Sequence, residues 1–165
     1  MNQTATPPLE GEELQNWLTH DQSPSGVIKE GFPCNDINAA AQHGLTPLTK
    51  ASRAGDAAKV AALLQRGARL DIRNADGNNA LWLACVGANL EVIDVLIKAG
   101  VDIDNQNDNG ATCLMYAASA GKDAVVKALL AAGANSKLTS RDDYTALDMA
   151  ATLPCLQLLR KATTS

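Results

Sequence analysis

The side chains best suited to metal or redox chemistry in this chain are its four cysteines. They lie far apart in the sequence, at Cys34, Cys85, Cys113 and Cys155. Zinc sites usually combine closely spaced cysteines with histidines at ligand spacing, and the sequence contains neither arrangement. The pattern therefore favours free structural thiols in small core positions, as in a reducing cytoplasm. A metal site and a functional or redox-active thiol are the alternatives.

Nucleophilic catalysis would need a Ser or Cys beside a base that a third group orients. The two histidines of the chain, His20 and His43, are not part of any such arrangement in the sequence. The sequence also lacks a glycine-rich phosphate loop. We therefore predict no catalytic residue and expect that the protein is not an enzyme.

The acidic run at residues 102–110 has the oxygen-rich composition of a calcium loop. In that loop a glycine is sixth and a bidentate glutamate is twelfth. Counting from Asn105 places Gly110 sixth but Tyr116 twelfth, and counting from Asp104 places Asn109 sixth. We interpret the run as a turn whose Asp and Asn side chains accept hydrogen bonds from backbone N–H groups. No bound metal or cofactor is expected.

A period of 33 residues organises the elements that would carry these side chains. It is visible in three sets of positions: Gly44, Gly77, Gly110 and Asp143; Leu48, Leu81, Leu114 and Leu147; and Ala51, Ala84, Ala117 and Ala150. A fixed period of this length predicts stacked repeats, each of which buries its apolar face against its neighbours. Such proteins usually present a surface to a partner.

One period predicts two helices and a turn. Thr46 can cap the first helix, and Pro47 follows where a missing N–H costs nothing. The second helix is expected at about residues 56–66 and is ended by Gly67, which can adopt a positive φ. A polar stretch with a tight-turn signal, Asn74-Ala75-Asp76-Gly77, follows. The predicted fold is therefore an all-α solenoid of stacked helix pairs with protruding turns.

This pattern resembles the ankyrin repeat over about residues 25–161. The matching motifs are Thr46-Pro47-Leu48, Val125-Val126, Leu129-Leu130 and Gly133-Ala134-Asn135. The histidine of the ankyrin motif is replaced at its four positions by Thr49, Trp82, Met115 and Asp148. The glycine between the helices becomes Ala88 in the second repeat, with Gly87 one place earlier. The resemblance implies a protein–protein interaction module.

The period also divides the chain into units. We expect a flexible N-terminus (1–9), an N-terminal capping unit (10–43), three repeats (44–76, 77–109 and 110–142) and a truncated C-terminal capping repeat (143–165). A helix is predicted at about 10–20. At the other end, Thr145 is expected to begin a fourth helix pair whose first helix is shortened by Pro154. Irregular, polar ends are typical of capping units.

Composition and charge limit the partners. The net charge is −4, which disfavours a nucleic-acid surface. The sequence shows neither a signal peptide nor an apolar run of membrane-spanning length. We therefore expect a cytoplasmic protein that binds neither nucleic acid nor membrane and is a monomer when free.

In ankyrin repeat proteins the turn tips and the exposed side of each first helix form a concave binding face. Carried over by register, the resemblance implies that this face comprises Arg53, Asp76, Asn78, Trp82, Val86, Asp108, Asn109, Met115, Tyr116, Ser119, Arg141, Asp142 and Tyr144. Tyrosine, tryptophan and arginine are enriched at interface hot spots. For Trp82 and Met115 the alternative is that they fill the seam between repeats in place of the missing histidine.

Two segments, 74–85 and 102–116, carry a narrower resemblance. They look like the corresponding parts of small ankyrin proteins encoded in bacterial nitrogen-fixation gene clusters. This resemblance implies a nitrogenase component or a maturation factor as the partner. The leading hypothesis is a non-catalytic binding module. The alternatives are a regulatory inhibitor or chaperone of an enzyme, and a thiol-based metal carrier that uses Cys85 or Cys113.

Overall fold

The computed structural model describes residues 37–38, 40 and 42–164 of the chain. This part contains seven α-helices and one short 3-10 turn. In chain order they are η1 (Gln42–Gly44), α2 (Pro47–Ala54), α3 (Ala57–Gln65), α4 (Ala80–Val86), α5 (Leu90–Lys98), α6 (Cys113–Ser119), α7 (Asp123–Ala131) and α8 (Leu153–Thr164). The predicted flexible N-terminus (1–9), the helix expected at 10–20 and Cys34 lie outside the described residues.

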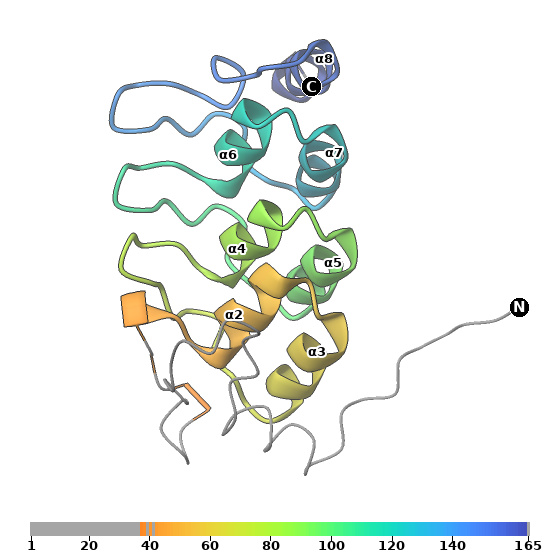
Figure 1. The fold of residues 1–165 in the computed structure, drawn as a ribbon. Helices are drawn as coiled ribbons and strands as arrows, with labels where there is room; N and C mark the ends of the chain where they lie inside the picture. Colours follow the sequence, from red (N-terminus) through yellow and green to blue (C-terminus); the bar gives the residue numbers. More distant parts are fainter. Residues whose placement is uncertain (1–36, 39, 41, 165) are drawn as a thin grey trace, which may run out of the picture.

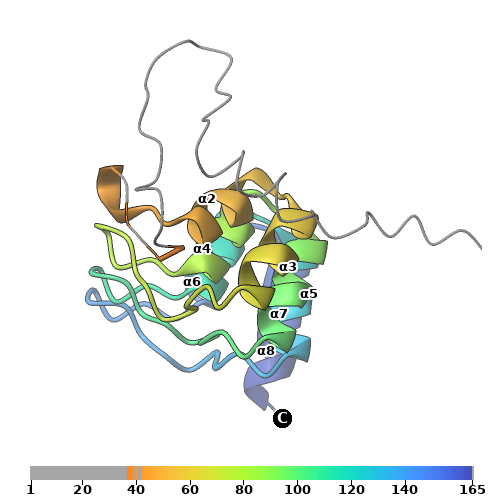
Figure 2. The same cartoon turned by 90° about the horizontal axis from the view of Figure 1, so that it is seen from below.

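The helices form two parallel rows. Helices α2, α4 and α6 make one row, and α3, α5, α7 and α8 make the other (Figures 1 and 2). Long turns extend from the first row on the side away from the second, one between each helix pair and the next (Figure 2). The described residues therefore form the predicted all-α solenoid of stacked helix pairs with protruding turns.

Each first helix begins at a polar side chain that satisfies a free backbone N–H group. The accepting atoms are Thr46 Oγ1, Asn79 Oδ1 and Thr112 Oγ1, at 3.2, 3.1 and 3.2 Å from the amide nitrogens of Thr49, Trp82 and Met115. The caps recur 33 residues apart, so the local chemistry of helix initiation repeats with the period.

Three backbone positions per unit take the left-handed conformation, and at two of them the structure keeps it even where glycine is absent. Asp143 has a φ of 63°, close to the 74°, 81° and 72° of its register equivalents Gly44, Gly77 and Gly110. Between the helices of the second pair, Ala88 has a φ of 52°. The replacement of glycine at these positions has therefore not changed the course of the chain.

The core is a continuous column of small and medium apolar side chains between the two rows. Leucines at repeat positions fill it: Leu48, Leu81 and Leu114 from the first helices, and Leu63, Leu96 and Leu129 from the second. Cys155 and Leu159 of α8 are also fully buried, and both belong to the same cluster. Helix α8 therefore covers the end of the column.

The C-terminal unit differs from the prediction. Residues 146–149 form turns, and the single helix α8 begins at Leu153. Thr112, the cap of α6, lies 11 positions before the start of α7. Its register equivalent Thr145 lies only 8 positions before the start of α8, and this segment is too short for a helix and its connection. Pro154 lies in the first turn of α8, where no N–H is needed. The expectation of a fourth helix pair with a first helix shortened by Pro154 is wrong.

Candidate protein-binding face

The protruding turns and the first-row helices α2, α4 and α6 meet at an angle, and we call the surface within this angle the concave face (Figure 2). Its turn tips are residues 74–78, 107–111 and 140–144. The first two tips are built on an asparagine. The side-chain oxygen of Asn74 accepts from the backbone N–H groups of Asp76 and Asn78, each at 3.0 Å. Asn107 makes the same two bonds one repeat later, so the acidic run at 102–110 includes a turn built in the predicted way.

Each turn is also tied to the next one. Backbone N–H groups of Ala75, Asp108 and Arg141 donate to the carbonyl oxygens of His43, Asp76 and Asn109 at 2.9, 3.0 and 3.0 Å. Side chains add a second link, because Arg73 Nη2 donates to Gln106 O at 2.7 Å and Gln106 Nε2 to Thr139 O at 2.9 Å. These bonds fix the spacing of the tips before any partner arrives.

The structure separates the thirteen residues predicted for this face into three groups. Those exposed to solvent are Arg53, Asp76, Asp108, Asn109, Ser119, Arg141, Asp142 and Tyr144, and those half-buried are Trp82, Val86 and Tyr116. Asn78 and Met115 are buried, with 8% and 1% of their surface exposed. Met115 lies in the core, so its placement on a partner-contacting surface needs correction. Its backbone N–H is bonded to Thr112, and its side chain fills the seam between repeats.

The two half-buried aromatic residues lie against each other across a repeat boundary. The ring centroids of Trp82 on α4 and Tyr116 on α6 are 5.3 Å apart, and the rings are tilted by 40°. Tilted pairs at this separation are favourable beyond the area that they bury. Trp82 therefore packs between repeats and also keeps part of its ring at the surface.

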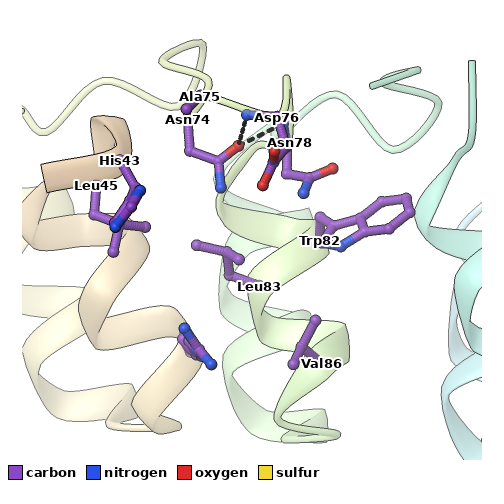
Figure 3. A pocket seen from close by; sticks show the side chains of 10 residues that line it. His43, Leu45, Asn74, Ala75, Asp76, Asn78, Trp82, Leu83 and Val86 are labelled. Carbon is purple, nitrogen blue, oxygen red and sulfur yellow. Dashed lines mark hydrogen bonds between the residues drawn. The ribbon is translucent and has the colours of Figure 1, made fainter. Parts of the chain in front are cut away.

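A hollow of about 320 Å³ opens on this face between the first and second helix pairs (Figure 3). Its lining comprises His43, Leu45, Arg53, Asn74, Ala75, Asp76, Asn78, Trp82, Leu83 and Val86. The sequence prediction missed five of these lining residues: His43, Leu45, Asn74, Ala75 and Leu83. His43 and Leu45 could have been found from the period, since they precede Asp76 and Asn78 by one repeat.

The described cysteines are buried within the solenoid. Cys85, Cys113 and Cys155 are 0%, 3% and 0% exposed. Cys113 Sγ donates to the carbonyl oxygen of Ile103 at 3.3 Å. The neighbouring Cys113 thiol and burial raise the pKa of Cys85 well above its ordinary value. In the part of the chain that the structure describes, no three His, Cys, Asp or Glu side chains gather as a potential metal site.

Cys155 has a different environment at the C-terminal end. Its Sγ lies 2.9 Å from Asp123 Oδ1, which also accepts from Thr152 Oγ1 at 2.7 Å. Burial and this contact raise the pKa of the thiol. In turn, the hydrogen bonds from Cys155 and Thr152 lower the pKa of the Asp123 carboxyl. The three side chains tie α8 to the start of α7.

The helix pairs, the turns and their period are those of an ankyrin solenoid, and comparison with known families agrees. The family model for ankyrin repeats (3 copies) matches residues 24–107 and 88–164, so the chain belongs to the ankyrin repeat family. Members of this family are generally protein–protein interaction modules and are typically non-catalytic. No curated protein matches the chain. None of the helices in the described ranges is long and apolar enough to cross a membrane.

Proposed function

We propose that this chain is a non-catalytic adaptor that binds a cytoplasmic partner protein through its concave face. The observation that carries the proposal is the row of turn tips, whose spacing is fixed by a backbone hydrogen bond between each tip and the next. A surface that is already ordered loses little conformational entropy when it binds, so more of the contact energy appears as affinity.

The side chains offered by this face suit protein recognition. Tyr144 is 54% exposed at the third tip, beside the exposed Arg141. Exposed tyrosine and arginine are the types that most often anchor interfaces, where truncation to alanine costs about 2 kcal/mol or more. On the surface of a free protein the same truncations usually change stability by only about 0.5 kcal/mol. Binding and folding can therefore be tested separately.

The test uses the triple variant Arg53→Ala, Arg141→Ala and Tyr144→Ala. The wild-type chain captures its partner from cell extract, and mass spectrometry identifies it. Isothermal titration calorimetry then compares both proteins with that purified partner. We expect the triple variant to bind at least about tenfold more weakly, with an unchanged circular dichroism spectrum. The matched control, Lys98→Ala with Lys127→Ala on the opposite, outer helices, should bind as wild type. Equal losses for both variants would reject the concave face.

A nitrogenase component or maturation factor is the narrower candidate for the partner. Its support is the resemblance of segments 74–85 and 102–116, which contribute Trp82, Tyr116 and two turn tips to the concave face. The experiment is surface plasmon resonance with each purified nitrogenase component and maturation factor over the immobilised chain. Binding lost in the triple variant would support this partner, and no binding by the wild-type chain would reject it.

The consequence of binding separates the remaining alternatives. An inhibitor would lower the activity of the captured partner, whereas a chaperone would raise its yield of refolding without affecting the activity of the folded form. A metal carrier that used Cys85 or Cys113 would have to open the second and third repeats, because both thiols are buried. Activity and refolding assays with and without the chain distinguish the first two cases.

A further inference from the structure

The hollow on the concave face has an apolar middle. Leu83 is buried at its floor, and Leu45, Trp82 and Val86 are half-buried around it. Figure 3 shows Leu83 between Leu45 on one side and Trp82 on the other, with the turn at Asn74–Asn78 above them. This arrangement offers a partner a site for one apolar side chain.

The corresponding place in the next repeat is different. Tyr116 occupies the register position of Leu83, and its ring packs on Trp82. Val86 occupies the register position of Arg53. The combination of a leucine floor and an arginine therefore belongs to the junction of the first two helix pairs and is not a general property of the repeat.

Two opposite charges lie at the ends of this hollow. Asp76 is in the turn before α4, and Arg53 is in the last turn of α2, beside the end of α4, where its carbonyl closely approaches Gly87. Both side chains are exposed. Among the described residues, neither carries a side-chain hydrogen bond or an ion pair. Each charge is therefore available to a charge of opposite sign on a ligand.

The length of α4, which runs along this hollow, gives the scale of the hollow. A helix rises about 1.5 Å per residue, so the path from the Asn79 cap to Val86 is about 10 Å long. An extended peptide advances about 3.3 Å per residue. The hollow therefore spans about three to four residues of an extended chain.

We propose that this hollow binds an extended segment of the partner protein that carries a basic residue, an apolar residue and an acidic residue within about four positions. The basic residue pairs with Asp76, the apolar side chain enters the space over Leu83, and the acidic residue pairs with Arg53. The inference rests on the proposed function, because it names the kind of segment that the concave face recognises.

The experiment selects peptides from a random dodecapeptide phage library on the full-length wild-type chain and on the charge-exchanged variant Arg53→Glu with Asp76→Arg. Wild type should enrich peptides with a basic–apolar–acidic pattern in one chain direction. The exchanged variant should enrich the opposite order. A synthetic peptide of the wild-type pattern should bind the exchanged variant at least about tenfold more weakly in fluorescence anisotropy, since two attractions become repulsions.

A matched control makes the same exchange outside the hollow. On the outer helix α5, Asp94→Arg with Lys98→Glu leaves the net charge unchanged, as the test variant does, and should bind the wild-type peptide normally. If the exchanged variant melts at a lower temperature, the neutral variant Arg53→Gln with Asp76→Asn replaces it and should weaken the peptide severalfold. No enriched pattern, the same pattern on both proteins, or an equal loss in the control overturns the inference.

Failure of this inference is distinguishable from failure of the proposed function. A partner whose binding depends on Arg141 and Tyr144 but not on Arg53 and Asp76 would refute the peptide site and leave the concave face in place. A partner that is insensitive to every concave variant would refute both.

Discussion

A β-carbon on Gly87 would lie only 2.8 Å from the backbone carbonyl oxygen of Arg53. Real β-carbons essentially never approach a backbone atom so closely, so the first helices of the first two pairs touch here through a glycine. Because the glycine between the helices lies at position 87 in this repeat, alanine occupies position 88, where φ is 52°. The second repeat thus gains a close helix contact and accepts strain in the next residue.

Ala88→Gly should stabilise the protein. The left-handed conformation costs an L-residue about 1–2 kcal/mol, and the greater entropy of glycine in the unfolded chain offsets about half of this gain. We expect the free energy of unfolding, measured by urea titration, to rise by about 0.5–1 kcal/mol. The opposite change at the equivalent position, Gly121→Ala, should lower it. A decrease for Ala88→Gly would contradict the strain.

Gly87→Ala should destabilise the protein, because the new methyl group forces α2 and α4 apart. We expect a loss of about 1–3 kcal/mol by the same titration, the range for overpacking a tight contact. Gly133→Ala is not a matched control, since its φ is 94°, whereas Gly87 has an ordinary helical φ of −74°. A stability equal to wild type would show that the contact relaxes freely.

The end of the core column depends on α8. Leu159 is 0% exposed, and its truncation to alanine should cost about 2–5 kcal/mol. Leu153 of the same helix is 65% exposed, so Leu153→Ala should stay within about 0.5 kcal/mol of wild type. Thermal unfolding followed by circular dichroism measures both. Similar melting temperatures for the two variants would mean that α8 does not cap the solenoid.

Asp123 should make stability depend on acid pH. The hydrogen bonds from Cys155 and Thr152 lower the pKa of this carboxyl from its ordinary value of 3.8 in the folded chain. Its contribution is therefore present above pH 3.8 and is lost as the pH falls through the lower folded pKa. Unfolding measured between pH 7 and pH 2 should show a weaker acid dependence in Asp123→Asn than in wild type. Parallel pH profiles would contradict this linkage.

The thiols should be free but protected. In denaturant, titration with Ellman's reagent should give four thiols per chain. In the native protein Cys85, Cys113 and Cys155 should react slowly, because they are buried and the raised pKa of Cys85 and of Cys155 keeps these two thiols protonated. Elemental analysis should find no stoichiometric zinc or iron. One metal ion per chain, lost in Cys85→Ala, would revive the metal-carrier hypothesis.

The repeat architecture could be predicted because its signals are local. Thr46 and Pro47 mark a helix start, and Gly67 adopts a φ of 88° just after the end of α3. The C-terminal unit could not be predicted in the same way. The segment that begins at Thr145 has a good helix start, but the shortened distance to α8 decides its conformation, and that helix is placed by packing against α7 rather than by its own sequence.

The candidate site was predicted less completely. Register assigned Arg53, Asp76 and Val86 to one face, and the structure brings the three together around one hollow. Their contact with a partner stays a prediction. The register did not distinguish the burial of Met115 from that of Trp82, because both residues replace the same histidine of the motif. Their depth depends on the neighbouring side chains: Met115 is enclosed in the core, whereas Trp82 packs on Tyr116 and stays half-buried.

The hydrogen bonds between the turn tips have the translational symmetry of a one-dimensional lattice. The donors at Ala75, Asp108 and Arg141 follow one another at one period, and so do the acceptors at His43, Asp76 and Asn109. Each turn tip therefore donates a backbone N–H to the segment one repeat before it in the same way. A duplicate of residues 110–142 inserted after position 142 would find an acceptor for its arginine N–H, because the carbonyl oxygen of Asp142 is the register equivalent of those of Asp76 and Asn109. The hydrogen bonds between the tips therefore set no limit on the number of repeats that can be stacked in this way.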